Sequence, residues 1–153
     1  MAVAERQMRL ERRTGRGMLL FMINVDGLKC INDSFGHLEG DCALKRTSAV
    51  LEETFRDSDV VAPLGGDEFA VLAIEATRHS EPTIKTRLFE RLKSISAEQS
   101  RYEVSLSLGV ARVDPRNVTS IGELMAKADR AMYEQIRRRS RPVLETEPSF
   151  QSQ

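Results

Sequence analysis

The sequence contains no tryptophan, few cysteines, no excess of charge of either sign and no apolar run of about 18 residues. Cys30 and Cys42 are too few for a disulfide scaffold and are typical of a protein kept in a reducing cytoplasm. We expect neither a membrane-spanning segment nor a secretory signal, because the N-terminal residues are charged rather than apolar. Since 23 Lys and Arg balance 23 Asp and Glu, composition predicts no nucleic-acid polymer and no membrane surface as a partner.

The length of 153 residues suits one domain with a single core. Residues 1–17 are charged and helix-prone, and we interpret them as a helical lead-in. Residues 18–141 carry the regular patterns of a folded domain. Residues 142–153 are polar, contain two prolines and are predicted to be disordered.

Between the two ends, helical and strand periodicities alternate along the chain. The run 19–25 is nearly all apolar and predicts a strand buried on both faces. The adjacent glycines Gly65 and Gly66 predict a tight hairpin between two short strands. The expected order is βααββαβα, a ferredoxin-like α/β (α+β) domain of the nucleotidyl-cyclase type, with an antiparallel or mixed sheet covered by helices on one side. The remaining elements are predicted as a short helix within 26–37, helices at 39–55, 84–95 and 121–136 (capped by Thr119 or Ser120), and strands at 60–64, 69–74 and 104–110.

Two acidic clusters are predicted to meet at the end of the first strand. Asn24, Val25 and Asp26 end that strand, and Asp67 and Glu68 follow the glycine corner. Pairing of the first strand with the hairpin would bring these clusters together. Carboxylate and carbonyl oxygens at one strand end are the ligands that Mg²⁺ takes, together with substrate phosphates. Glycines at the corner let the backbone approach a bulky ligand closely.

A third cluster surrounds the short helix after the first strand. Lys29 and the first backbone N–H groups of that helix suit phosphate groups. Asn32 and Asp41 offer an amide and a carboxylate to the edge of a base. These residues predict a nucleotide site, while helix capping remains an alternative for Asp26, Asn32 and Asp41.

Several of these motifs, in this order, closely resemble the GGDEF family of diguanylate cyclases. The matching runs are Asp26-Gly27-Leu28-Lys29, Ile31-Asn32-Asp33, Gly36-His37, Gly40-Asp41, Leu64-Gly65-Gly66-Asp67-Glu68-Phe69, 104–111 and 128–133. The resemblance covers about residues 18–140.

The resemblance implies an enzyme that joins two GTP molecules into cyclic di-GMP and releases two pyrophosphates. It implies a homodimer in which two domains face each other, a divalent cation (Mg²⁺ or Mn²⁺), a cytoplasmic location and an upstream sensor domain in a longer parent protein. The implied residues are Asn24, Val25 and Asp67 for the metal, Asp67 and Glu68 for catalysis, and Gly27, Leu28, Lys29, Asn32, Asp41, Gly65 and Gly66 for GTP.

An inhibitory product site is also implied by position. Arg56 and Asp59 form an RxxD pair whose Asp59 is separated from the Gly65-Gly66 turn by five residues, as the family's product-binding motif is. Arg87 falls where family members often supply a further arginine. An ordinary surface ion pair is the alternative reading of Arg56 and Asp59.

The sequence departs from the family pattern around the triphosphate. The first metal aspartate is Asn24, the arginine before the glycine turn is Pro63, and the lysine after the last-helix tyrosine is Ile136. One charge at contact range is worth about 4 kcal/mol at an effective dielectric near 20. Losing about 2–4 kcal/mol in the transition state would slow turnover roughly 30- to 1000-fold. Two functions follow: a cyclase of reduced activity, or a catalytically silent receptor for cyclic di-GMP or GTP.

Overall fold

A computed structural model describes residues 5–6, 9–10, 17–74, 80–99, 101–113 and 120–140. Most of the predicted lead-in 1–17 and all of the predicted tail 142–153 lie outside these residues. The element order in the described part is βααββαβα, as predicted from sequence periodicity.

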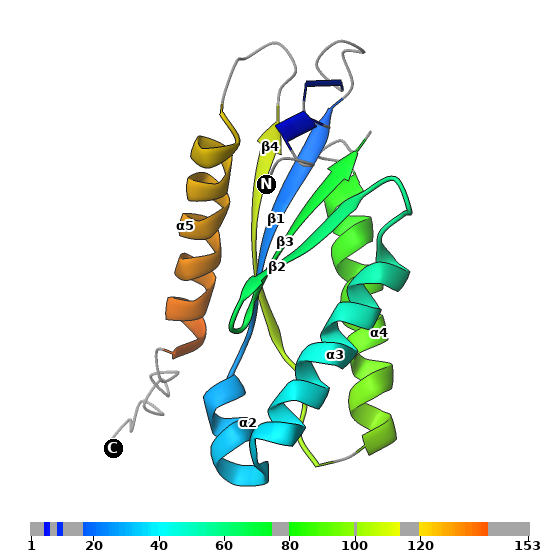
Figure 1. The fold of residues 1–153 in the computed structure, drawn as a ribbon, viewed down its shortest axis with the longest axis vertical. Helices are drawn as coiled ribbons and strands as arrows, with labels where there is room; N and C mark the ends of the chain where they lie inside the picture. Colours follow the sequence, from blue (N-terminus) through cyan, green and yellow to red (C-terminus); the bar gives the residue numbers. More distant parts are fainter. Residues whose placement is uncertain are drawn as a thin grey trace, which may run out of the picture.

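Four strands form one antiparallel sheet in the order β2-β3-β1-β4 (Figure 1). β1, the first strand in the chain, is therefore central and pairs on both sides. The glycine corner joins the neighbouring strands β2 and β3, as the hairpin prediction required. The strands are β1 (Met18–Val25), β2 (Val60–Gly65), β3 (Glu68–Ile74) and β4 (Leu106–Val113).

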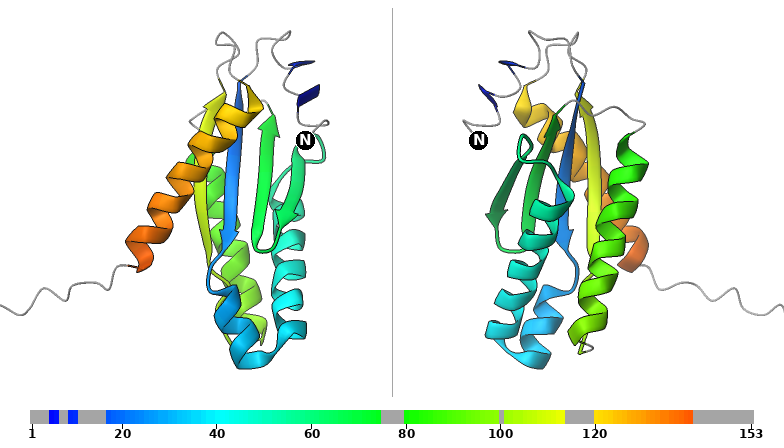
Figure 2. Two further views of the ribbon diagram at one scale, coloured as in Figure 1. Left: turned by 60° about the vertical axis from the view of Figure 1, so that its left-hand side comes forward. Right: turned by 90° about the vertical axis from the view of Figure 1, so that its right-hand side faces the viewer.

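Helices cover both faces of this sheet, which corrects the prediction that they lie on one side. Figure 2 shows α5 on one face and the pair α3 and α4 on the other. The helices are α2 (Leu28–Phe35), α3 (His37–Thr54), α4 (Ser80–Gln99) and α5 (Ile121–Ser140). The last of these begins after Ser120, whose Oγ accepts the N–H of Glu123 at 3.2 Å, so Ser120 is the cap.

The two-sided cover explains why β1 is apolar at every position except Asn24. Leu19, Phe21 and Ile23 belong to the core shared with α3 and α4. Met18 and Leu20 belong to a second core beneath α5. Successive side chains of a strand point to opposite faces, so a strand with helices on both sides needs apolar residues on both of its faces. The one half-buried position in β1 is Asn24, next to its end.

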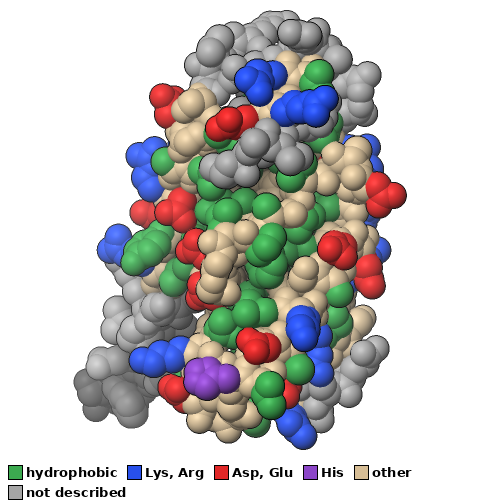
Figure 3. All heavy atoms as spheres, viewed as in Figure 1, with side chains coloured by type: hydrophobic (Ala, Val, Ile, Leu, Met, Phe, Trp, Pro, Cys, Tyr) green, Lys and Arg blue, Asp and Glu red, His purple; other side chains and the backbone are tan. Residues whose placement is uncertain are grey.

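β2 forms one edge of the described sheet, and its residues are half-buried or exposed. Figure 3 shows apolar side chains at the surface in the middle of this view, with charged side chains toward the sides. Among the helices that the structure describes, none combines the length and the apolar character that crossing a membrane requires.

Candidate active site at the end of the first strand

The corner of the β2–β3 hairpin lies against the end of β1. Asn24 pairs with Glu68 in the sheet register, and the N–H of Val25 donates to the carbonyl of Asp67 at 2.8 Å. The proximity predicted between the two acidic clusters is therefore confirmed. The roles predicted for these residues are a separate matter and remain predictions.

The glycine corner needs glycine for its backbone conformation. Gly65 has φ 99° and Gly66 has φ 59°, both in the region that side chains rarely adopt. A Cβ at either residue would meet no described atom within 4 Å. The corner is thus open on the outside, which leaves room for a ligand over its backbone.

Asp26 neither caps the following helix nor ends in open solvent. The N-cap of α2 is Gly27, which has φ 65° and no side-chain cap bond. The carboxylate of Asp26 instead accepts hydrogen bonds from Ser107 Oγ at 2.6 Å and Ser105 Oγ at 3.0 Å. Of the two readings left open for Asp26, helix capping is wrong.

Asn24 donates its side-chain amide toward the same carboxylate. Its Nδ2 lies 3.5 Å from Oδ1 of Asp26, a long contact near the limit of a hydrogen bond. The family pattern has an aspartate at this position. Asn24 therefore presents an amide donor in place of a carboxylate.

Excess negative charge surrounds Glu68. Desolvation by burial raises its pKa, and the nearby carboxylates of Asp129 and Asp67 raise the pKa further. Asp129 lies on α5 and was not predicted as a site residue, because its approach to Glu68 depends on how α5 crosses the sheet. A cation at this end of the sheet would relieve the repulsion.

The residues present fit a divalent cation only with help from a ligand. Hard oxygen donors come from the Asp67 carboxylate, the Val25 carbonyl and the Asn24 amide. Within the described ranges, no group of three or more His, Cys, Asp or Glu is arranged to hold a metal ion by itself. Mg²⁺ commonly completes its shell with substrate phosphates and water, so this donor set suits a metal that arrives with a nucleotide.

Asn32 carries a buried oxygen without a partner. Its Oδ1 has no hydrogen-bond partner among the described residues. A Cβ on Gly40 would lie 1.7 Å from this oxygen, so the Asn32 side chain occupies space that glycine at 40 leaves open. Asp41 follows directly and is exposed. Buried polar atoms are normally satisfied, so an orphaned amide oxygen beside an exposed carboxylate suits a site that a polar ligand completes.

Arg56 and Asp59 bind the end of β3. The Asp59 carboxylate accepts the N–H of Ile74 and the N–H of Arg56, each at 2.9 Å. The guanidinium of Arg56 donates to the carbonyl of Ile74. Since β2 begins at Val60 opposite Leu72, these two side chains take the place of a strand partner for Ile74. Arg56 and Asp59 are therefore more than a surface ion pair, because both side chains also bond to the backbone of Ile74.

Arg87 lies exposed on α4. One turn along α4, Arg91 Nη1 pairs with Glu53 Oε2 of α3 at 3.2 Å. The product-site residues predicted from sequence therefore lie around the C-terminal end of α3, away from the end of β1.

The structure explains how two departures from the family pattern are accommodated. Ile136 packs against the core beneath α5, where an apolar side chain is favoured over a lysine. Pro63 lies in the edge strand β2, opposite Phe69, where a missing N–H is tolerated.

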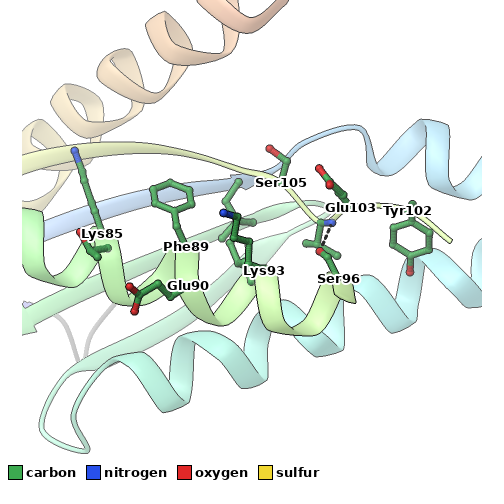
Figure 4. Close-up of a pocket in the computed structure, with 12 residues that line it drawn as sticks. Lys85, Phe89, Glu90, Lys93, Ser96, Tyr102, Glu103 and Ser105 are labelled. Atoms are coloured by element: carbon green, nitrogen blue, oxygen red, sulfur yellow. Dashed lines mark hydrogen bonds between the residues drawn. The ribbon is translucent and has the colours of Figure 1, made fainter. Parts of the chain in front are cut away.

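A separate groove of about 800 Å³ runs between α4 and the segment leading into β4 (Figure 4). Its walls include Phe89 and Lys93 of α4. The N–H of Val104 donates to Ser96 Oγ at 3.1 Å and ties the segment to the helix. None of the residues predicted for GTP or metal lines this groove.

Tyr102 connects the same segment to the start of α3. Its Oη donates to Glu39 Oε1 at 2.8 Å, and its ring packs against Phe35 with centroids 5.4 Å apart. Burial, followed by the hydrogen bond and the charge of Glu39, raises the pKa of Tyr102, although Arg46 opposes this. The tyrosine therefore remains a neutral donor at physiological pH.

Fold and site together define an α/β domain that gathers acidic and glycine residues at the end of a central antiparallel strand. The family model described as "Diguanylate cyclase, GGDEF domain" matches residues 2–141. The chain therefore belongs to the GGDEF family, as its motifs predicted.

Curated relatives are similar over most of this chain. It is 36% identical over 124 residues to the cyclic di-GMP phosphodiesterase NbdA of Pseudomonas aeruginosa, covering 80% of this chain and 16% of that protein. It is 35% identical over 123 residues to the probable diguanylate cyclase DgcC of Escherichia coli K12, covering 80% of this chain and 33% of that protein. The chain thus spans a third or less of the length of these relatives.

Solved structures show the same fold. The GGDEF domain of PA1120 (TpbB or YfiN) from Pseudomonas aeruginosa has a TM-score of 0.80 and 30% identity, covering 90% of this chain and 81% of that one. The active GGEEF domain of a diguanylate cyclase from Vibrio cholerae has a TM-score of 0.81 at 20% identity, covering 90% and 87%. This second likeness concerns the fold alone.

Proposed function

We propose that this domain is a cytoplasmic diguanylate cyclase that joins two GTP molecules into cyclic di-GMP, with turnover lowered by its own substitutions. The observation that carries the proposal is the hydrogen bond from Val25 to Asp67, which brings the glycine corner to the end of β1. Membership of a family whose model is described as a diguanylate cyclase supports the same reaction.

In the proposed site, α2 and the glycine corner hold the triphosphate. The backbone N–H groups of Gly27 and Leu28, with Lys29, would bind phosphate oxygens at the N-terminus of α2. Gly65 and Gly66 would lie beneath the nucleotide, since their outer side is open. These contacts fix the α-phosphorus in position, which is the main requirement of phosphoryl transfer.

Base recognition falls to Asn32 and Asp41. The unpartnered oxygen of Asn32 would accept an N–H of guanine, and the Asp41 carboxylate would accept others. Adenine presents an acceptor where guanine presents its N1–H donor, so this pair favours guanine.

Asn24, the Val25 carbonyl and Asp67 would hold a divalent cation together with the phosphates, and Glu68 would complete the acidic site. When bound, Mg²⁺ or Mn²⁺ neutralises charge on the phosphate oxygens. In the reaction, the 3′-oxygen of each GTP bonds to the α-phosphorus of the other and loses its proton. Each bond from the α-phosphorus to pyrophosphate breaks, so two pyrophosphates leave. A two-fold homodimer suits this symmetric product.

The product itself is proposed to bind at Arg56, Asp59 and Arg87. The Arg56 side chain is 58% exposed even though it contacts Ile74, so its guanidinium retains a surface for a guanine edge or a phosphate. An upstream sensor domain in a longer parent protein is part of the same proposal.

Incubation of the purified chain with GTP and either Mg²⁺ or Mn²⁺, followed by chromatography of the products, tests the reaction. We expect slow formation of cyclic di-GMP, abolished by Asp67→Ala and retained by Asp57→Ala, a change at an exposed residue outside the site. If neither metal supports any cyclic di-GMP at protein concentrations that give dimers, the cyclase proposal is wrong.

A further inference from the structure

Ser107 of β4 and Ser105, just before this strand, reach the turn between β1 and α2. Ser107 Oγ donates to Oδ1 of Asp26 at 2.6 Å, and Ser105 Oγ donates to Oδ2 at 3.0 Å. The backbone makes a further bond, from the N–H of Asp26 to the carbonyl of Ser105 at 2.8 Å. Asp26 is therefore attached to β4 through both its side chain and its main chain.

The position of Asp26 gives these bonds their significance. On one side of it lies Val25, whose N–H binds Asp67 and whose carbonyl is the proposed metal ligand. On the other side lies Gly27, which begins the phosphate-binding end of α2. One residue thus joins the two parts of the proposed site.

The local backbone has few other supports. Gly27 has φ 65° and no side chain, and α2 has a single buried residue, Ile31. The other packing of α2 lies toward its C-terminal half, where Phe35 contacts Tyr102 and Asn32 lies against Gly40. The first three residues of the helix are half-buried or exposed. Contacts at its preceding residue therefore determine where its first N–H groups point.

We propose that Asp26, Ser105 and Ser107 form a positioning cluster that orients the phosphate-binding amides of α2 against the hairpin corner. Asp26 in this role is a positioning residue, since a serine hydroxyl bonds to each of its carboxylate oxygens. Ser107 is fully buried, so its hydroxyl contributes a bond shielded from water. This inference rests on the proposed function for its ligand, but its geometry can be tested without one.

The first experiment measures amide hydrogen exchange in the free protein by NMR. Ser105→Ala, at an exposed position, and the double variant with Ser107→Ala are compared with the wild type. We expect the amides of Val25 and Asp26 to exchange about tenfold faster or more in the double variant, since bonds to a charged group are among the stronger ones. Amides in the middle of β1 should be unchanged.

Thr54→Val is the matched control, because it removes another buried hydroxyl, at the C-terminal end of α3. It should leave the exchange of Val25 and Asp26 as in the wild type. Ser105→Thr keeps a hydroxyl at position 105. In this variant the amides of Val25 and Asp26 should exchange at wild-type rates. Unchanged exchange at Val25 and Asp26 in the double variant would overturn the inference, whatever the protein binds.

The second experiment separates phosphate positioning from general damage to the fold. Kd is measured by NMR titration for GTP and for guanosine, which has the base but no phosphate. The double variant should bind GTP about tenfold more weakly than the wild type and bind guanosine equally well. Equal weakening for both ligands would contradict a positioning role. A wild type that binds neither ligand would refute the proposed function, and the exchange experiment would still decide the positioning.

Discussion

At the scale of the residue, Asp59 shows how a motif with a predicted binding role can also hold the fold together. Its side chain is 4% exposed, and it accepts two backbone N–H groups, from Ile74 and Arg56. An apolar replacement would leave the part-buried N–H of Ile74 without this partner, whereas the exposed N–H of Arg56 can bond to water. Such groups cost about 1–3 kcal/mol each when buried.

We therefore predict that Asp59→Ala lowers the free energy of unfolding by about 1–3 kcal/mol. Asp57→Ala, at an exposed position two residues earlier, should change it by less than about 0.5 kcal/mol. Urea denaturation of both variants measures the difference. Equal stability of Asp59→Ala and wild type would show that other contacts hold the turn. A loss of affinity for cyclic di-GMP in Asp59→Ala would then reflect a lost binding contact rather than a destabilised fold.

The raised pKa of Glu68 predicts a pH dependence of stability. A carboxyl whose pKa is higher in the folded state favours folding while it is protonated, and this contribution is lost as pH rises through the folded pKa. In metal-free buffer, Glu68→Gln should therefore raise the Tm relative to wild type at pH 7 and have a smaller effect near pH 4. Glu134→Gln, an exposed change on α5, is the control for the loss of one charge. The same Tm difference at both pH values would contradict the prediction.

Asn24 offers the clearest test of the reduced activity. Asn24→Asp restores a charge worth roughly 30- to 1000-fold in turnover if about 2–4 kcal/mol reaches the transition state. The new carboxylate would also face Asp26, whose Oδ1 now lies 3.5 Å from the Asn24 amide. We expect a lower Tm without metal, recovery on addition of Mn²⁺, and faster formation of cyclic di-GMP, with little change in product affinity at Arg56. If Asn24→Asp turns over GTP no faster than the wild type, the low activity is assigned to Pro63 and Ile136 instead.

At the scale of the element, the contact between β4 and α5 depends on one glycine. A Cβ on Gly109 would lie 1.8 Å from the carbonyl oxygen of Ala128 and 2.3 Å from the nitrogen of Met132. Both atoms are helix backbone and cannot turn aside as a flexible side chain can. The helix therefore lies on the strand as closely as glycine permits.

Gly109→Ala should force α5 away from the sheet and lower the free energy of unfolding by about 3 kcal/mol or more. Gly122→Ala is the matched control, because its Cβ would be 3.8 Å from the nearest described atom and alanine favours a helix. That variant should be equal to wild type or more stable by up to about 1 kcal/mol. Thermal unfolding of the two alanine variants distinguishes local crowding at 109 from a general effect of the methyl group.

At the scale of the whole molecule, the proposed reaction needs two copies of the domain. Each site holds one GTP and the product contains both, so the rate per protein molecule should rise with protein concentration until dimers saturate. Fusion to a parallel coiled coil should bring that plateau to lower concentration by raising the effective concentration of the partner. A rate per molecule that is constant from nanomolar to micromolar protein would contradict catalysis between two copies.

The sequence by itself determined the order of elements, the central apolar strand and the glycine corner. These features depend on local physics: the periodicity of apolar residues and the positive φ that Gly65 and Gly66 adopt. The proximity of Asp67 to the end of β1 was also predictable, because a hairpin beside the first strand leaves few registers that keep apolar residues buried.

Only the tertiary structure decided which face each helix covers and which side chains meet across the sheet. The apolar run of β1 is consistent with cover on both faces, but it does not say which helix takes which face. The bonds from Ser105 and Ser107 to Asp26, and the approach of Asp129 to Glu68, join residues more than 60 positions apart. Polar side chains on a strand or helix look alike in sequence whether they face solvent or a partner, and only packing of the distant elements distinguishes the two.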